Sequence, residues 1–189
     1  WWLAGEKPYF SALPYIHRAM KWADEVGLDV LLDLHTAPGC QNGFDNGGIE
    51  GVLLWHLDPK NIQLTVDKLE YIAKTFNNYT SFWGLEVLNE PHYEMDLQVI
   101  VDFYKMAYPA IRKHTDKVIV FHDGFRPSNE IWKPFFTQED LKNVMFDLHF
   151  YHCFTHDMTV GPFDKHIDMI LNKRLPVIKE VSKYVDVII

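Results

Sequence analysis

The sequence predicts an α/β fold in which short parallel strands alternate with amphipathic helices. Between the strands, apolar residues recur at a 3.6-residue period and predict helices at 15–27, 61–76, 97–114, 128–136 and 163–173. No Pro/Gly/Ser-rich linker or charge block divides the chain, so we expect residues 1–189 to form a single domain. The strands are predicted from apolar runs rich in Val, Ile, Leu and Phe: "LDVLLDLH" (28–35), "FWGLEVLN" (82–89), "DKVIVFHD" (116–123), "NVMFDLHF" (143–150) and "LPVIKEVS" (175–182).

The composition of the chain argues against some classes of binding partner. Of the 189 residues, 48% are hydrophobic, which is enough to bury a sizeable core. The net charge of −8 provides no basic field for nucleic acid or anionic lipid, and no apolar run is long enough to span a membrane. Cys40 and Cys153 lie far apart without metal-ligand spacing, so neither a disulfide framework nor a zinc site is expected. We expect no nucleic-acid or membrane partner and no cofactor.

Polar residues follow nearly every predicted strand, which favours a barrel over an open sheet. In a (β/α)₈ TIM barrel every strand can deliver a side chain to one rim, whereas an open doubly wound sheet concentrates its site at one switch point. Five strands are too few to close such a barrel, which typically needs about 250 residues. We therefore expect an incomplete (β/α)₈ barrel. The strand-end residues are His35, Asn89, Glu90, His122, Asp123, His149, Tyr151 and Glu180.

The stretch "GLEVLNEP" (84–91) ends a buried strand on two groups that are costly to desolvate. Adjacent strand residues face opposite sides, so Asn89 and Glu90 can both reach a cleft only if the strand ends or bulges there. Pro91 cannot continue the ladder and favours such an ending. Glu86, on the same strand, is interpreted instead as a structural carboxylate paired inside the barrel.

Several motifs in consistent order resemble glycoside hydrolase family 5, and most of all its exo-β-1,3-glucanase branch. These motifs are "LDLHTAPGCQNGFDNGG" (32–48), "LEVLNEP" (85–91), "VIVFHDGFRP" (118–127) and "DLHFYHCF" (147–154). The resemblance implies that about strands 3–7 of the barrel are present. It also implies double-displacement cleavage of β-glucosidic bonds in β-glucans or β-glucosides, without a metal.

Such a mechanism needs two carboxyl groups roughly 5–5.5 Å apart. The resemblance implies that Glu90 is the general acid/base, with a raised pKa, and that Glu180 is the nucleophile. Lys179 and Val181 depart from the family pattern of Gly-Glu-aromatic-Ser at that position. Asn89 is expected to contact the sugar 2-hydroxyl.

The remaining site residues also come from matching motifs. Tyr151 is expected to orient Glu180, and His35 and His149 to line the sugar subsite. Phe44 and Phe154 resemble an aromatic pair that clamps a glucosyl unit, because apolar ring faces suit sugar C–H groups.

Ten histidines keep a second class of function open. His149, His152 and His156 with Asp157, or His35 with His122, could ligate a metal in an amidohydrolase-like barrel. A third alternative is an inactive fragment or carbohydrate-binding pseudoenzyme. The glycosidase hypothesis is preferred because it explains Asn89, which the metal hypothesis does not.

Overall fold

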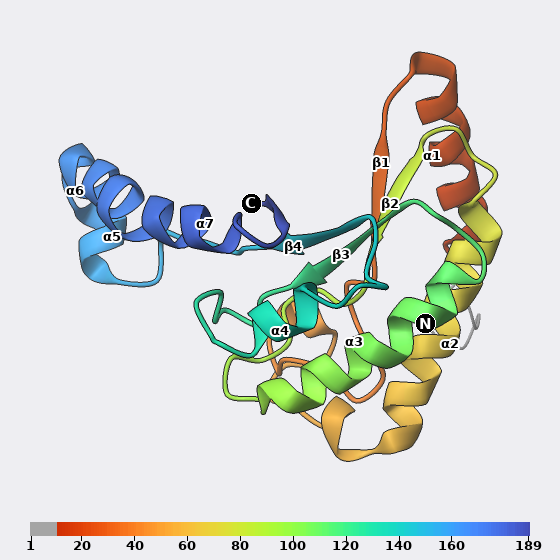
Figure 1. Cartoon of the computed structure of the whole chain (residues 1–189), viewed down its shortest axis with the longest axis horizontal. Helices are drawn as coiled ribbons and strands as arrows, with labels where there is room; N and C mark the ends of the chain where they lie inside the picture. Colours follow the sequence, from red (N-terminus) through yellow and green to blue (C-terminus); the bar gives the residue numbers. More distant parts are fainter. Residues whose placement is uncertain (1–10) are drawn as a thin grey trace.

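The computed structural model describes residues 11–189, apart from the side chain of Asp157. Its centre is a parallel sheet in the order β1-β2-β3-β4-β5, so each strand pairs with the next one along the chain (Figure 1). The strands are β1 (Val30–Asp33), β2 (Phe82–Glu86), β3 (Val118–His122), β4 (Val144–Asp147) and β5 (Asp186–Ile188). Sequential parallel pairing with helical crossovers is the arrangement of a (β/α)₈ barrel, of which this chain forms a part.

The helices begin and end at residues that satisfy their free backbone groups. Asp58 accepts a hydrogen bond from Lys60 N at the start of α2, and Asp96 accepts one from Gln98 N at the start of α3. Helix α1 ends at Gly27, whose φ of 70° closes the last turn. The helices are α1 (Leu13–Val26), α2 (Pro59–Phe76), α3 (Leu97–Arg112), α4 (Trp132–Phe136), α5 (His156–Val160), α6 (Phe163–Met169) and α7 (Leu175–Val181), with short 3₁₀ segments at Asp45–Gly47 and Trp55–Leu57 and a π-helical segment at Ile170–Arg174.

Four of the five predicted strands are confirmed, and the fifth was placed wrongly. Residues 175–182 lie in and just after helix α7, and the strand that pairs with β4 is β5, several residues later. Pro176 lies just after the π-helical segment Ile170–Arg174, where the helical hydrogen-bond pattern is already interrupted. A short apolar run bounded by proline suits either a helix or a strand, so its pattern did not decide the matter.

An aromatic core fills the space between the sheet and helices α2, α3 and α4. Helices α2 and α3 pack against each other on one side of the sheet, while α5, α6 and α7 (blue) extend away from them (Figure 1). The core contains Trp55, Phe76, Phe103, Tyr104, Phe121, Trp132, Phe135, Phe136 and Phe146. Strands β2 and β3 approach closely at Gly84, where an added Cβ would lie 2.8 Å from Val118 O.

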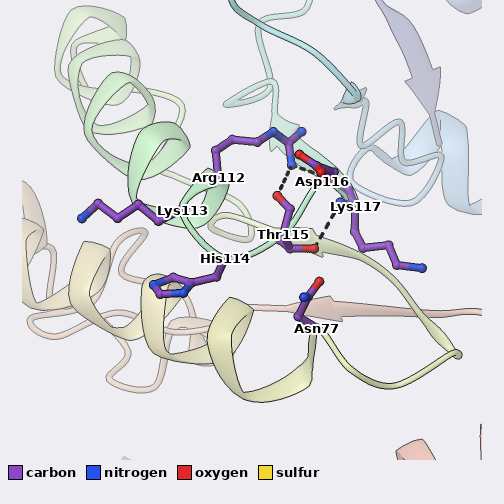
Figure 2. A pocket seen from close by; sticks show the side chains of 7 residues that line it. All are labelled: Asn77, Arg112, Lys113, His114, Thr115, Asp116 and Lys117. Carbon is purple, nitrogen blue, oxygen red and sulfur yellow. Dashed lines mark hydrogen bonds between the residues drawn. The ribbon is translucent and has the colours of Figure 1, made fainter.

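A polar pocket of about 430 Å³ lies where the chain enters β3, at the amino ends of the strands. Figure 2 shows that it is lined by Asn77 and by the segment 112–117. The Arg112 guanidinium donates to four backbone oxygens, those of Thr115, Lys117, Lys142 and Asn143. This pocket therefore lies where the Arg112 side chain ties two loops together through their backbone oxygens. Among the described residues, no helix is long and apolar enough to cross a membrane.

Candidate active site

The carboxyl ends of β1 to β4 meet at one rim, at the opposite end of the strands from the pocket lined by Asn77 and residues 112–117. Nδ1 of His149, after β4, lies 2.7 Å from Oε1 of Glu90, after β2. Nε2 of His35, after β1, lies 3.5 Å from the amide nitrogen of Asn89. The rings of His122, at the end of β3, and His149 are 4.3 Å apart. Four strands therefore deliver polar side chains to one place, as the sequence predicted.

The backbone at Glu90 explains how two adjacent residues both reach this rim. Strand pairing continues to Asn89, whose N–H donates to Leu34 O. Glu90 then adopts a φ of 45°, a left-handed conformation that is uncommon outside glycine, directly before Pro91. Such backbone strain is typical of functional sites. The expected break in the strand thus takes the form of one left-handed residue.

Three donors converge on the carboxylate of Glu90, whose residue is only 5% exposed. Oε1 accepts hydrogen bonds from His149 Nδ1 and from the Tyr151 hydroxyl, at 2.7 and 2.5 Å. Oε2 accepts a hydrogen bond of 2.8 Å from Asn46 Nδ2. Asn46 is itself held by Asn42, which donates to its side-chain oxygen at 2.8 Å. His149, Tyr151 and Asn46 all donate to Glu90, and these hydrogen bonds favour its ionised form.

The expected rise in the pKa of Glu90 is wrong for this arrangement. Burial opposes ionisation, but the hydrogen bonds from His149, Tyr151 and Asn46 outweigh it and lower the pKa of Glu90 to about 2. Burial also works against a charged His149, yet its contacts with Asp147 and Glu90 raise the pKa of that imidazole to about 10. Glu90 and His149 therefore form an ion pair with a 2.7 Å contact.

Beneath the rim, three strands carry buried or partly buried carboxyl groups into the barrel interior. Glu86, on β2, is 5% exposed, and its Oε1 has no partner among the described residues. Burial, together with the neighbouring charges of Asp33 and Asp147, raises the pKa of Glu86 to about 8. Burial likewise raises the pKa of Asp33. The interior position of Glu86 is as expected, but the expectation that its carboxylate is paired is wrong for Oε1 among the described residues.

A pocket of about 800 Å³ opens directly over Glu90. It combines aromatic rings with polar groups, as sugar-binding sites do. Phe44 and Phe154, the predicted aromatic pair, both line it, and Phe154 is 80% exposed. The full lining consists of Gly43, Phe44, Asp45, Asn46, Glu50, Glu90, Tyr93, Phe125, Tyr151 and Phe154.

Glu180 does not lie at this rim. It is an exposed residue of helix α7, and it accepts a hydrogen bond from Lys183, one turn further along. The expectation that it would end a strand opposite Glu90 is therefore wrong, because the segment that carries it is helical. Tyr151, which was expected to orient Glu180, instead donates to Glu90.

The histidines near Glu90 are arranged to share protons and do not fit a metal ion. Atoms of Glu90, His122 and His149 lie within 4.8 Å of one another. However, Nδ1 of His122 accepts a hydrogen bond from Gly124 N, so the proton of the neutral ring is on Nε2, which cannot then ligate. Both nitrogens of His149 face carboxylate oxygens.

The other proposed ligand sets are not assembled within the part of the chain that the structure describes. The groups of potential ligands there contain neither His152 nor His156, and they do not pair His35 with His122.

Sequence reasoning missed several residues of the site. Gln41, fully buried, donates from one amide to His35 O and Asn89 O, both at 2.9 Å. Asn46 binds Glu90, and Phe125 reaches the pocket from a left-handed backbone with φ of 61°. Both Gln41 and Asn46 lie in the "APGCQNGFDN" segment, whose polar residues were the available signal. Phe125 lies in the motif "VIVFHDGFRP" (118–127), which was the available signal for it.

Comparison with known proteins supports this arrangement. The model of the family "Cellulase (glycosyl hydrolase family 5)" matches residues 8–180. A glucan 1,3-beta-glucosidase of Lachancea kluyveri is 32% identical over 82% of this chain and 36% of its own length. Glucan 1,3-beta-glucosidase I/II of Saccharomyces cerevisiae is 35% identical over 86% of this chain and 38% of its own length. This chain thus spans less than half the length of these curated relatives.

Solved structures confirm the fold. A hyperthermophilic endo-beta-1,4-glucanase aligns with a TM-score of 0.68 at 17% identity, covering 97% of this chain and 61% of that one. The catalytic domain of an endoglucanase from Thermobifida fusca aligns with a TM-score of 0.60 at 18% identity, covering 93% of this chain and 49% of that one. Together with the family match and curated relatives at 32–35% identity, these findings show that the chain belongs to glycosyl hydrolase family 5.

Proposed function

We propose that the protein to which this chain belongs is a retaining glycoside hydrolase that cleaves β-glucosidic bonds in β-glucans or β-glucosides. The observation that carries the proposal is the carboxylate of Glu90, held by three donors at the base of an 800 Å³ pocket. The names of the curated relatives favour a β-1,3-linked glucan as substrate.

Glu90 acts as the general acid/base in this proposal. Its ionised form, stabilised by His149 and Tyr151, is the form that takes a proton from water when the glycosyl–enzyme intermediate is hydrolysed. Before the first step Glu90 must carry a proton. One of the groups that donate a hydrogen bond to Oε1 therefore has to move away from that oxygen when substrate binds. Tyr151, whose hydroxyl contacts both Glu90 and His149, is the group placed to reorient.

The nucleophile must be a second carboxylate roughly 5–5.5 Å from Glu90. The strand β5 pairs with β4, and Ile188 lies opposite Asp147, so the chain that leaves β5 emerges beside the tip that carries His149 and Tyr151. We therefore place the nucleophile at the carboxyl end of β5.

Phe44 and Phe154 form opposite sides of the sugar site in this proposal, with Asn89 binding the 2-hydroxyl. Their rings come from different loops, after β1 and β4, and both contact other aromatic rings: His92 for Phe44, and Tyr151 for Phe154. Flat apolar faces supported in this way suit the C–H faces of a glucosyl unit.

The test uses the full-length parent protein with an aryl β-glucoside and with a soluble β-1,3-glucan. Proton NMR of the first product should show the β-anomer, as retention requires. Glu90→Ala should slow the reaction strongly, and azide should rescue it by forming a β-glucosyl azide, because azide needs no general base. Glu94→Gln, an exposed neighbour that does not line the pocket, is the matched control. Release of the α-anomer would show inversion, and binding without hydrolysis would show a carbohydrate-binding pseudoenzyme.

A further inference from the structure

The motif Asp-x-His occurs twice at the carboxyl ends of strands, as Asp33-Leu34-His35 and Asp147-Leu148-His149. Each aspartate is the last residue of its strand, β1 or β4. Residues two apart on a strand share a face, so each histidine lies over its aspartate. The contacts are 2.5 Å from Asp33 Oδ2 to His35 Nδ1 and 3.1 Å from Asp147 Oδ2 to His149 Nε2.

Each histidine then reaches one of the two adjacent residues at the tip of β2. Nδ1 of His149 lies 2.7 Å from Glu90 Oε1. Nε2 of His35 lies 3.5 Å from Asn89 Nδ2. Two parallel chains of contacts, Asp147–His149–Glu90 and Asp33–His35–Asn89, therefore converge on neighbouring residues that the proposed reaction uses.

The proton requirements of the two chains differ. A neutral imidazole carries one N–H, but both nitrogens of His149 face carboxylate oxygens, those of Asp147 and Glu90. With both carboxyl groups ionised, the two contacts are satisfied only if His149 is an imidazolium. The other polar groups that face this ring are the Tyr151 hydroxyl, the edge-on His122 and the carboxyl of Glu86.

His35 needs only the correct neutral tautomer. Asp33 fixes the proton on Nδ1, and Nε2 is left as an acceptor for the amide N–H₂ of Asn89. The backbone of Asn89 is held separately, because Gln41 donates to its carbonyl oxygen. The imidazole therefore determines how the Asn89 side chain is turned.

We propose that Asp33 and Asp147 are positioning residues that act through these histidines: Asp33 orients the Asn89 amide, and Asp147 holds His149 as the cation that faces Glu90. The effect on catalysis rests on the proposed function, whereas the states of the two rings do not. The raised pKa of His149 agrees with its place between two carboxylates.

The first measurement determines the protonation states of the His35 and His149 rings in the ¹⁵N-histidine-labelled, full-length parent protein. In the unsubstituted protein, NMR should show His149 as an imidazolium at pH 8 and His35 protonated on Nδ1. In Asp147→Asn, the titration of His149 should move to lower pH by at least about one unit, since one opposite charge is removed. In Asp33→Asn, the Nδ1 preference of His35 should be lost. A neutral His149 at pH 8 in the unsubstituted protein would overturn the proposal, even if a variant failed to fold.

The second measurement is kinetic. Asp147→Asn should leave the Glu90 limb of the kcat/KM profile in place, because His149 is still cationic where Glu90 titrates, and should bring the loss of kcat/KM that follows His149 deprotonation about one pH unit lower. Asp33→Asn should lower kcat/KM for a β-glucoside about tenfold and for the 2-deoxyglucoside much less, with an unchanged pH profile. Asp186→Asn is the control, an exposed carboxyl on the first residue of β5, at the opposite end of the strands from His149.

A merely structural role for the aspartates would give a different pattern: lower stability, an unchanged His149 titration and equal losses on both substrates. If the unsubstituted parent hydrolysed no β-glucoside, the proposed function would fail, and the NMR titrations would still decide the states of the two rings.

Discussion

Asn46 and Tyr151 hold opposite oxygens of the Glu90 carboxylate, although they lie 44 and 61 residues from it in sequence. Asn46 comes from the loop after β1 and Tyr151 from the loop after β4, so the carboxylate is fixed from both sides of β2. With His149 as a third donor, the pKa of Glu90 falls to about 2 against the opposing effect of burial.

The first prediction concerns acid stability. The folded pKa of Glu90 lies below its unfolded value of about 4.5, so its ionised form stabilises the fold above that pH. This stabilisation is lost as the pH falls towards 2. In the full-length parent, wild type should be more stable than Glu90→Gln by a pH-dependent amount of about 3 kcal/mol at pH 7, and this amount should shrink below about pH 4.5. Urea unfolding from pH 3 to 7 measures it, and a constant gap would contradict it.

A second prediction concerns Glu86, whose pKa is shifted in the opposite direction, upwards. Its folded pKa of about 8 lies above the unfolded value, so between these values only the unfolded state is ionised and stability falls as pH rises. Glu86→Gln keeps the shape and removes the titration. This variant should therefore gain stability relative to wild type from pH 5 to pH 8. Urea unfolding at each pH measures this difference. If the unfolding free energies of the two proteins changed equally with pH, a basic group elsewhere in the parent would be neutralising Glu86.

A third prediction concerns Gln41, which joins the tips of β1 and β2. Its amide donates to His35 O and Asn89 O and accepts from Ala37 N in a fully buried position. Gln41→Ala leaves these groups without partners and should cost about 2–3 kcal/mol of unfolding free energy, together with a lower kcat. Gln63→Ala, on the exposed face of α2, should stay within about 0.5 kcal/mol. Equal effects of the two variants would remove the role assigned to Gln41.

The rim of the barrel could be predicted because its signals are local. Each of the strands β1 to β4 is a short apolar run that ends on a polar residue, and parallel pairing brings such ends together. The break at Glu90 could also be expected, since Pro91 follows it directly. These inferences needed no knowledge of contacts between distant segments.

The ionisation of Glu90 could not be predicted in the same way. Its pKa depends on donors that come from loops far away in sequence, and a chain that ends a strand on a glutamate gives no sign of them. The position of β5 was missed for a related reason. Only three residues long, it begins on an aspartate, whereas the neighbouring run at 175–182 is longer yet helical.

The last prediction concerns Glu180, which the sequence motif suggested as nucleophile. An exposed glutamate on α7 that pairs with Lys183 should contribute little, because solvent screens surface ion pairs. In the parent protein, Glu180→Ala should change kcat for an aryl β-glucoside by less than about twofold and leave the midpoint of urea unfolding unchanged. Glu90→Ala, measured alongside, shows that the assay detects loss of a catalytic carboxylate. A comparable loss in Glu180→Ala would require α7 to rearrange so that its carboxylate reaches Glu90, and would restore Glu180 as the nucleophile.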